Sequence, residues 1–161
     1  MQNKSEFIKI VKQNEGIIYK ISRVYTNDEE DQKDLYQEVV YQLWKSFGSF
    51  RAESKVSTWM YRIALNTSIA WLNKRKRKPH KISIDFELHN KADEKDTLME
   101  ERLNVLYAQI KQLGVVDKGL ILLFLEGKSY EEISQITGFT SSNVGTRLAR
   151  IKQKLKKRIL K

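Results

Sequence analysis

The sequence predicts an all-α protein made of two small helical domains joined by a linker. Seven glycines and one proline, Pro79, interrupt its 161 residues. Along most of the chain, apolar residues recur every three or four positions, as in helices that pack one face on a core. Residues 1–78 and 99–161 each carry a net charge of +6, whereas residues 79–98 carry −2. We therefore expect domains at 1–78 and 99–161, with a linker at 79–98.

The first domain opens with one or two amphipathic helices that end near Tyr25, followed by a turn and a possible helix cap at 26–28. The next helix contains DLYQEVVYQLW at residues 34–44. Three apolar residues lie four apart on its core side: Leu35, Val39 and Leu43. Its other side carries an acidic and amide-rich set: Asp34, Gln37, Glu38 and Tyr41. These side chains form either a solvated helix face or a docking surface for a protein, since their sign is wrong for phosphate. Spacing alone favours the solvated face.

A third helical segment, STWMYRIALNTSIAWLNKRKRK, covers residues 57–78. Two apolar stripes predict that most of it is buried, with Trp59 in the core. Polar residues lie near its less buried edge: Arg62, Asn66 and Asn73. It ends in five consecutive cationic residues at 74–78. Aromatic rings beside cations suit single-stranded nucleic acid, although aromatic residues at helical spacing are more often core.

The remaining composition argues against several classes of function. The chain has no cysteine, so disulfides, thiolate catalysis and cysteine-bound zinc are excluded. His80 and His89 lie in the linker without a matching ligand cluster, so we expect no metal and no cofactor. The sequence shows no oriented base and no pair of acids at a spacing typical of an active site, so we do not expect an enzyme. The longest apolar run, Leu120–Leu125, is too short to span a bilayer and the first residues are polar. We expect a cytoplasmic protein without membrane insertion.

The second domain is expected to hold four helices around one core. Its first apolar stripe consists of Leu103, Leu106, Ile110 and Leu113, and it is broken by Gly114. Residues 120–125 are dense enough in apolar side chains to form a buried central helix. Gly127 ends that helix and leads into two further helices, which are the most informative stretch of the chain.

That stretch, residues 129–157, predicts a helix-turn-helix. Ser129 and Glu132 have the spacing of a capping box, and Gly138 suits the left-handed position that ends a helix. Thr140, Ser141 or Ser142 can cap the second helix. The buried stripe of that helix is Val144, Leu148, Ile151 and Leu155. Its opposite face carries Asn143, Thr146, Arg147 and Arg150, and glycine at position 145 is a poor helix former. This face suits the DNA major groove, although a solvated basic hairpin has the same pattern.

Three stretches in this order, 34–44, 57–78 and 120–156, resemble a bacterial RNA polymerase sigma factor of the extracytoplasmic-function (ECF) class of the sigma-70 family. The resemblance implies a transcription initiation factor that binds core RNA polymerase and directs promoter-specific initiation. It implies that residues 34–44 bind polymerase, through Asp34, Gln37 and Glu38. It implies that residues 57–78 read the melted minus-ten strand, through Arg62, Asn66, Asn73 and Arg75. Contacts to the minus-thirty-five duplex are implied for Ser141, Ser142, Asn143, Thr146, Arg147 and Arg150.

Two rival functions remain open at this stage. One is a helix-turn-helix regulator that acts without docking on polymerase, and the other is a non-specific RNA-binding or structural protein that uses the two basic blocks. The acidic face of residues 34–44 discriminates, because only a sigma factor needs it for polymerase. Many members of the family are held inactive by an anti-sigma factor, and the sequence identifies no such partner.

Overall fold

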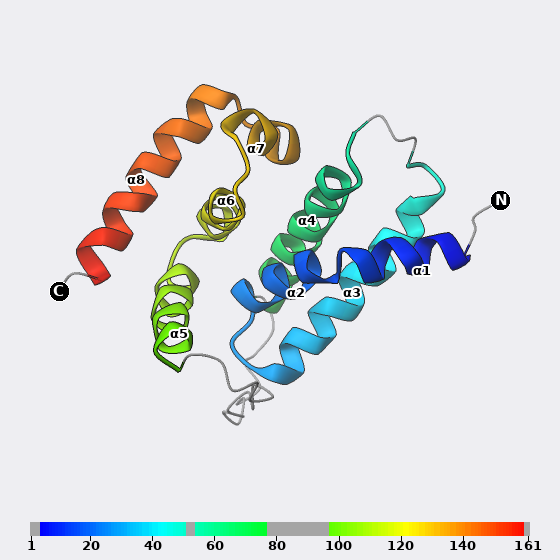
Figure 1. Cartoon of the computed structure of the whole chain (residues 1–161), viewed down its shortest axis with the longest axis horizontal. Helices are drawn as coiled ribbons and strands as arrows, with labels where there is room; N and C mark the ends of the chain where they lie inside the picture. The colour runs from blue at the N-terminus through cyan, green and yellow to red at the C-terminus, as the bar shows by residue number, and fades with distance from the viewer. Residues whose placement is uncertain (1–3, 51–53, 77–96, 160–161) are drawn as a thin grey trace.

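The computed structural model describes residues 4–50, 54–76 and 97–159, and in these ranges it contains eight α-helices and no β-strand. The helices are α1 (Lys4–Gln13), α2 (Glu15–Val24), α3 (Glu29–Phe47), α4 (Val56–Lys76), α5 (Thr97–Lys111), α6 (Val115–Leu125), α7 (Tyr130–Thr137) and α8 (Ser141–Ile159). The predicted all-α class is confirmed. Figure 1 shows α1–α4 on one side of the molecule and α5–α8 on the other. The expected linker lies outside the described residues except for Thr97 and Leu98, which begin α5.

In the amino-terminal half, α2, α3 and α4 pack against one another, and α1 lies across α3. The predicted cap is confirmed: the side chain of Asp28 accepts a hydrogen bond from the backbone N–H of Asp31 at 2.7 Å. The predicted core stripe of α3 is fully buried: Leu35, Val39 and Leu43. Each such leucine or valine contributes about 1.5–3 kcal/mol of burial free energy. The Phe7 ring attaches α1 at a centroid distance of 5.1 Å from the Trp44 ring.

Helix α4 is covered on two sides, by α2 and α3 and by α6 and α7. Its buried apolar residues are Trp59, Met60, Tyr61, Ala64 and Leu65, so the predicted core position of Trp59 is confirmed. The helix begins at Val56, one residue before the segment chosen from the sequence. Because both sides of α4 meet protein, few of its positions are left for polar contacts.

The carboxy-terminal half is built around α6. Residues Leu120–Leu123 of this helix are all buried, as predicted, because other helices surround them. Gly127 follows α6 with φ = 82°, a conformation that glycine adopts without strain. Two apolar residues expected in this core are instead exposed. Leu103 is 42% exposed because the first turns of α5 extend beyond the core, and Leu125 is 49% exposed at the end of α6.

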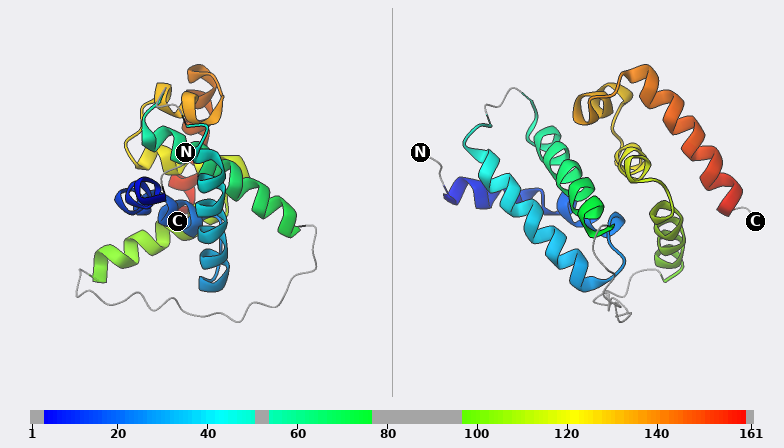
Figure 2. Two further views of the ribbon diagram at one scale, coloured as in Figure 1. Left: turned by 90° about the vertical axis from the view of Figure 1, so that its right-hand side faces the viewer. Right: turned by 180° about the vertical axis from the view of Figure 1, so that it is seen from behind.

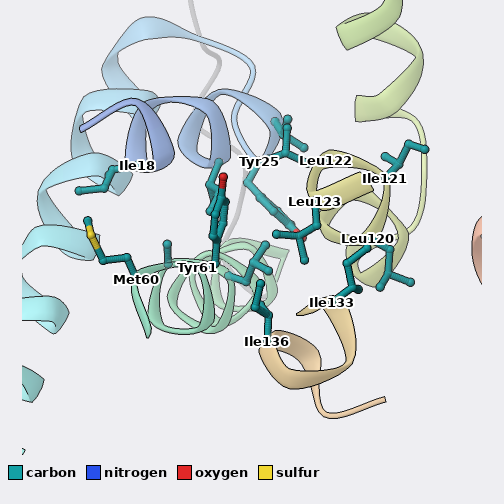
Figure 3. Packing of buried hydrophobic residues seen from close by; sticks show 14 of the residues in the cluster. Ile18, Tyr25, Met60, Tyr61, Leu120, Ile121, Leu122, Leu123, Ile133 and Ile136 are labelled. Atoms are coloured by element: carbon teal, nitrogen blue, oxygen red, sulfur yellow. The ribbon is translucent and has the colours of Figure 1, made fainter. Parts of the chain in front are cut away.

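The two halves are packed on each other, and their buried apolar side chains form one continuous cluster. Figure 3 shows Tyr25 of the amino-terminal half beside Leu123 of α6, and Ile136 of α7 beside α4. The views in Figure 2 also place α4 next to α6 and α7. The orientation of the two domains does not follow from the sequence, so this shared core is a finding of the structure.

Candidate polymerase and nucleic-acid interfaces

The helix-turn-helix of α7 and α8 is formed by the local interactions that the sequence predicts. The Ser129 side chain accepts a hydrogen bond from the N–H of Glu132 at 3.1 Å, and the Glu132 carboxylate accepts one from the N–H of Ser129 at 3.2 Å. These two hydrogen bonds confirm the capping box. The Ser129 N–H also lowers the pKa of Glu132 below its usual range. Gly138 ends α7 in the left-handed conformation, as predicted.

Helix α8 separates an apolar inner face from a polar outer face. Its predicted stripe is buried: Val144, Leu148, Ile151 and Leu155. Of the three candidate caps, the structure selects Thr140, whose hydroxyl accepts a hydrogen bond from the N–H of Asn143 at 3.1 Å. Five of the predicted duplex-contacting residues are exposed on the outer face: Ser141, Ser142, Asn143, Thr146 and Arg150. Side chains with this placement can reach base edges and phosphates in a major groove.

Arg147 differs from its neighbours on α8 because it is half-buried against the protein. Its guanidinium carbon lies 4.7 Å from the centre of the Phe139 ring, and one of its nitrogens lies 3.7 Å from an Asp117 carboxylate oxygen. Arg147 thus contacts the turn before α8 and helix α6, whereas Arg150 is exposed to solvent. This contact with α6 leaves Arg147 less available for DNA than Arg150.

Gly145 has a packing role that the sequence did not reveal. A β-carbon at this position would lie 3.2 Å from the Tyr130 ring, so the glycine lets α7 and α8 approach closely. Its cost as a helix residue is about 1 kcal/mol relative to alanine. Close packing of the two helices explains why this cost is tolerated.

The predicted minus-ten residues of α4 are solvent-facing but partly engaged with the rest of the chain. Arg62, Asn66 and Asn73 are exposed. The Arg62 guanidinium nevertheless donates a hydrogen bond to the backbone carbonyl oxygen of Gln135 in α7, at 2.9 Å. Arg62 is therefore held by the helix-turn-helix of the other half, whereas the side chains of Asn66 and Asn73 make no hydrogen bond within the described residues.

Arg75 is also engaged within the protein. One of its guanidinium nitrogens lies 2.9 Å from an Asp31 carboxylate oxygen, and its guanidinium carbon lies 4.8 Å from the centre of the Trp71 ring. Burial, followed by the neighbouring Asp28 carboxylate, raises the pKa of Asp31, although Arg75 acts in the opposite direction. This ion pair links the end of α4 to the start of α3. The cationic residues at 77 and 78 lie outside the described residues.

The candidate polymerase surface on α3 is exposed at Asp34 and Gln37, whereas Glu38 is half-buried and accepts a hydrogen bond from Gln42 at 3.0 Å. A cavity of about 230 Å³ lies beside this surface, between α2 and α3. Its lining residues are Tyr19, Glu29, Gln32, Lys33, Tyr36 and Gln37. The sequence analysis did not single out Tyr19 and Tyr36, because they lie on two different helices and the sequence does not show that these helices place them side by side.

Within the described residues, no group of three or more histidine, cysteine, aspartate or glutamate side chains is placed to hold a metal ion. No helix in the described ranges is long and apolar enough to cross a membrane. Both histidines considered as metal ligands, His80 and His89, lie outside those ranges.

Comparison with protein families gives two matches in the order expected from the sequence. The model for Sigma-70 region 2 matches residues 10–78, and the model for Sigma-70, region 4 matches residues 103–155. Among solved structures, the fold is similar to CnrH in complex with the cytosolic domain of CnrY, with a TM-score of 0.71, 19% identity and coverage of 98% of this chain and 89% of that one. It is also similar to the sigma factor RpoE from Bartonella quintana, in complex with the anti-sigma factor NepR. There the TM-score is 0.67 with 18% identity, and the match covers 96% of this chain and 94% of that one.

Two curated relatives show the family more directly. The RNA polymerase sigma factor SigV of Bacillus subtilis is 32% identical over 135 residues, which cover 82% of this chain and 78% of the relative. The ECF RNA polymerase sigma-E factor of Haemophilus influenzae is 31% identical over 141 residues, which cover 80% of this chain and 75% of the relative. The chain therefore belongs to the extracytoplasmic-function class of the sigma-70 family of RNA polymerase sigma factors.

Proposed function

We propose a division of labour within this sigma factor, which binds core RNA polymerase and directs promoter-specific transcription initiation. Residues 1–78 dock on polymerase and capture the melted minus-ten strand, residues 99–161 bind the minus-thirty-five duplex, and residues 79–98 connect them. The family matches at 10–78 and 103–155 support these boundaries. They also disfavour a helix-turn-helix regulator that acts without polymerase, because such a regulator would not need a domain similar to Sigma-70 region 2. Its work takes place in the cytoplasm, and the chain has no catalytic step of its own.

The polymerase contact is assigned to the outer face of α3, through Asp34, Gln37 and Glu38. Carboxylates and amides are suited to pair with arginine side chains on a protein partner, and the carboxylates repel DNA phosphate. The tyrosine-lined cavity next to Gln37 supports this assignment, because apolar pockets within a polar rim anchor partner side chains.

Duplex reading is assigned to the outer face of α8. The observation that carries this assignment is the exposed row of Ser141, Ser142, Asn143, Thr146 and Arg150 on a helix whose other side is fully packed. Short polar side chains near the helix start suit base edges, and the cationic residues from Arg147 onward suit phosphates. Arg147 joins these contacts once it leaves Asp117.

Strand capture is assigned to α4, through Arg62, Asn66, Asn73 and Arg75. Arg75 and Trp71 are adjacent, so a cation and an aromatic ring are available together for phosphate and base. Each half alone would bind DNA weakly, and tethering both to polymerase raises the effective concentration of the second contact. An anti-sigma factor is a further partner, because a solved structure with this fold is a complex of a sigma factor with one.

Transcription in vitro tests the proposal. Core polymerase is incubated with genomic fragments, with and without this protein, and the transcript start sites are mapped. We expect transcripts from a small set of shared promoter sequences only when the protein is present. The absence of promoter-dependent transcripts would overturn the proposal.

A further inference from the structure

Arg147 lies at the edge of α8, between the buried face and the exposed face of this helix. It belongs to a row of side chains spaced four, three and four residues apart, which places them along one line of the helix. The row consists of Asn143, Arg147, Arg150 and Lys154. Asn143, Arg150 and Lys154 are exposed, whereas Arg147 is half-buried. Arg147 is therefore positioned to reach either the protein or a duplex laid against α8.

A carboxylate of α6 pairs with Arg147. Helix α6 packs against α8, and Asp117 Oδ1 lies 3.7 Å from Arg147 Nη1. The Phe139 ring lies on the guanidinium at 4.7 Å from ring centre to guanidinium carbon. A phosphate group of DNA offers the guanidinium the same chemistry as Asp117, namely oxygen anions that accept hydrogen bonds from its N–H groups.

The contact with Asp117 satisfies Arg147 only in part. A distance of 3.7 Å is longer than the about 2.7–3.2 Å of a good N–H···O hydrogen bond, whereas Arg62 and Arg75 each make a contact at 2.9 Å. The Nε atom of Arg147 is buried and has no hydrogen-bond partner within the described residues. The Arg147 and Asp117 side chains are 35% and 25% exposed, so water screens their attraction. Arg147 can thus exchange Asp117 for another anion at little cost.

Such an exchange affects the balance between specific and non-specific binding to DNA. A contact to phosphate carries no sequence information, and each phosphate that is neutralised strengthens binding to any duplex. An Arg147 guanidinium that stays on Asp117 adds nothing to this general attraction. Contacts to base edges then make up a larger share of the binding free energy, which favours discrimination between sequences.

We propose that Asp117 and duplex phosphate compete for the Arg147 guanidinium, so that Asp117 helps to set the specificity of duplex reading. Asp117 lowers the affinity of α8 for all duplexes alike and leaves the contacts to bases unchanged. The apparent strength of the Arg147 contact is reduced by the fraction of molecules in which Asp117 holds it. The proposal rests on the assignment of duplex reading to α8.

The salt dependence of binding to a non-specific duplex tests this competition in the full-length chain. The probe is a labelled mixed-sequence duplex of about 20 base pairs, or two helical turns, and binding is followed by fluorescence anisotropy. Asp117→Asn removes the charge and keeps the size of the side chain. We expect it to bind at least about threefold more tightly than the parent. The slope of log K against log salt should become more negative by about 0.9, the value for one additional phosphate contact.

Two further variants exclude a general effect of charge. Glu131→Gln is the matched control, because it removes one acidic charge at an exposed position of α7 in the same half. It should leave the slope unchanged. In an Arg147→Gln background, Asp117→Asn should give no further gain, since the competition needs the arginine. An equal gain with and without Arg147 would show that Asp117 only repels DNA, and it would overturn the proposal.

Thermal unfolding of the same variants distinguishes competition from a purely structural ion pair. A lower Tm for Asp117→Asn with an unchanged salt slope would assign the pair to the fold alone and overturn the proposal. Asp117→Ser, which also lacks the charge, replaces Asp117→Asn if the asparagine variant does not fold.

Arg150→Ala, measured on the same duplex, tests the proposed function separately. If Arg150→Ala binds as tightly as the parent, α8 is not the duplex-binding helix and the proposed function fails. If Arg150→Ala binds more weakly while Asp117→Asn binds like the parent, only the competition for Arg147 fails.

Discussion

The two helices proposed to read the promoter, α4 and α8, carry similar polar residues but lie in different surroundings. Helix α8 packs through one face only, and Asn143 and Arg150 are exposed on the other. Helix α4 is packed on two sides, and its Arg62 and Arg75 are bonded to other parts of the chain. Of the residues proposed to read the promoter, five on α8 are exposed, whereas two of the four on α4 are bonded to other elements of the chain.

This contrast agrees with the order of events in initiation. A duplex is present from the beginning, but an unpaired strand exists only after polymerase has engaged the promoter.

The largest effect is expected from reversing the charge of the polymerase surface. Asp34→Lys with Glu38→Lys should weaken association with core polymerase at least about 30-fold. The new lysines would face cationic side chains of the partner, and like charges brought together at an interface cost about 2 kcal/mol or more. Binding of duplex DNA through α8 should persist. Association is measured by fluorescence anisotropy of labelled protein titrated with core polymerase.

The matched control is Glu101→Lys with Glu131→Lys, which changes net charge equally at exposed positions in the other half. It should retain polymerase association. If both double variants lose polymerase to the same extent, net charge alone explains the effect and the α3 surface has no specific role.

The next largest effect distinguishes the proposed duplex contact of α8 from the proposed strand contact of α4 in the polymerase-bound protein. Arg150→Ala should weaken promoter duplex binding by about 5- to 150-fold, the usual consequence of losing one base or phosphate contact. Arg62→Ala should leave duplex binding nearly unchanged and slow strand opening. Binding is measured by filter retention, and opening by permanganate reactivity of unpaired thymines. Equal effects of the two variants on both readouts would contradict the separate roles.

A smaller effect concerns the support of α8 by α7. Ser129→Ala removes the cap of α7 and should lower the free energy of unfolding by about 1 kcal/mol, a fall of about 2–4 °C in Tm. Ser129→Asp keeps an acceptor at the cap and should restore most of the stability. Thermal unfolding followed by circular dichroism measures both. A Ser129→Asp variant as unstable as Ser129→Ala would argue against the capping role.

The smallest effect depends on pH at the same cap. The pKa of Glu132 is lowered in the folded protein, so its charged form stabilises the fold above the unfolded value of about 4.5. That contribution is lost as pH falls through the lower folded pKa. The Tm advantage of the natural chain over Glu132→Gln should therefore be present at pH 7 and vanish in acid. An advantage that persists at the lowest pH would show that the carboxylate charge is not its source.

Much of the fold could be predicted from the sequence because it depends on local rules. The cap at Asp28, the capping box at Ser129 and the left-handed Gly138 each require only neighbouring residues. The buried stripe of α8 follows from helical period alone. Helical period also predicts burial for Leu103, in the first half of α5, and for Leu125, the last residue of α6, but no other described helix covers them.

The packing of one half on the other could not be predicted, because it depends on residues far apart in sequence. Gly119 reads as a poor helix residue until Leu65 and Tyr25 are seen beside it. The partners of Arg62 and Arg75 are also far away in the sequence: Arg62 contacts Gln135 of α7, and Arg75 contacts Asp31 of α3. Helical period predicts Arg62 near the less buried edge of the helix, and Arg75 falls in the cationic run at its end, but only tertiary structure shows what holds the two side chains.

Dependence on core polymerase is measured by comparing promoter binding of the free chain with that of the chain bound to core polymerase. Binding to a mapped promoter and to a shuffled duplex is measured at physiological salt, where non-specific contacts are weak. We expect the free chain to discriminate poorly, and the polymerase complex to prefer the promoter by about a thousandfold or more. Tight and sequence-specific promoter binding by the free chain would contradict the account.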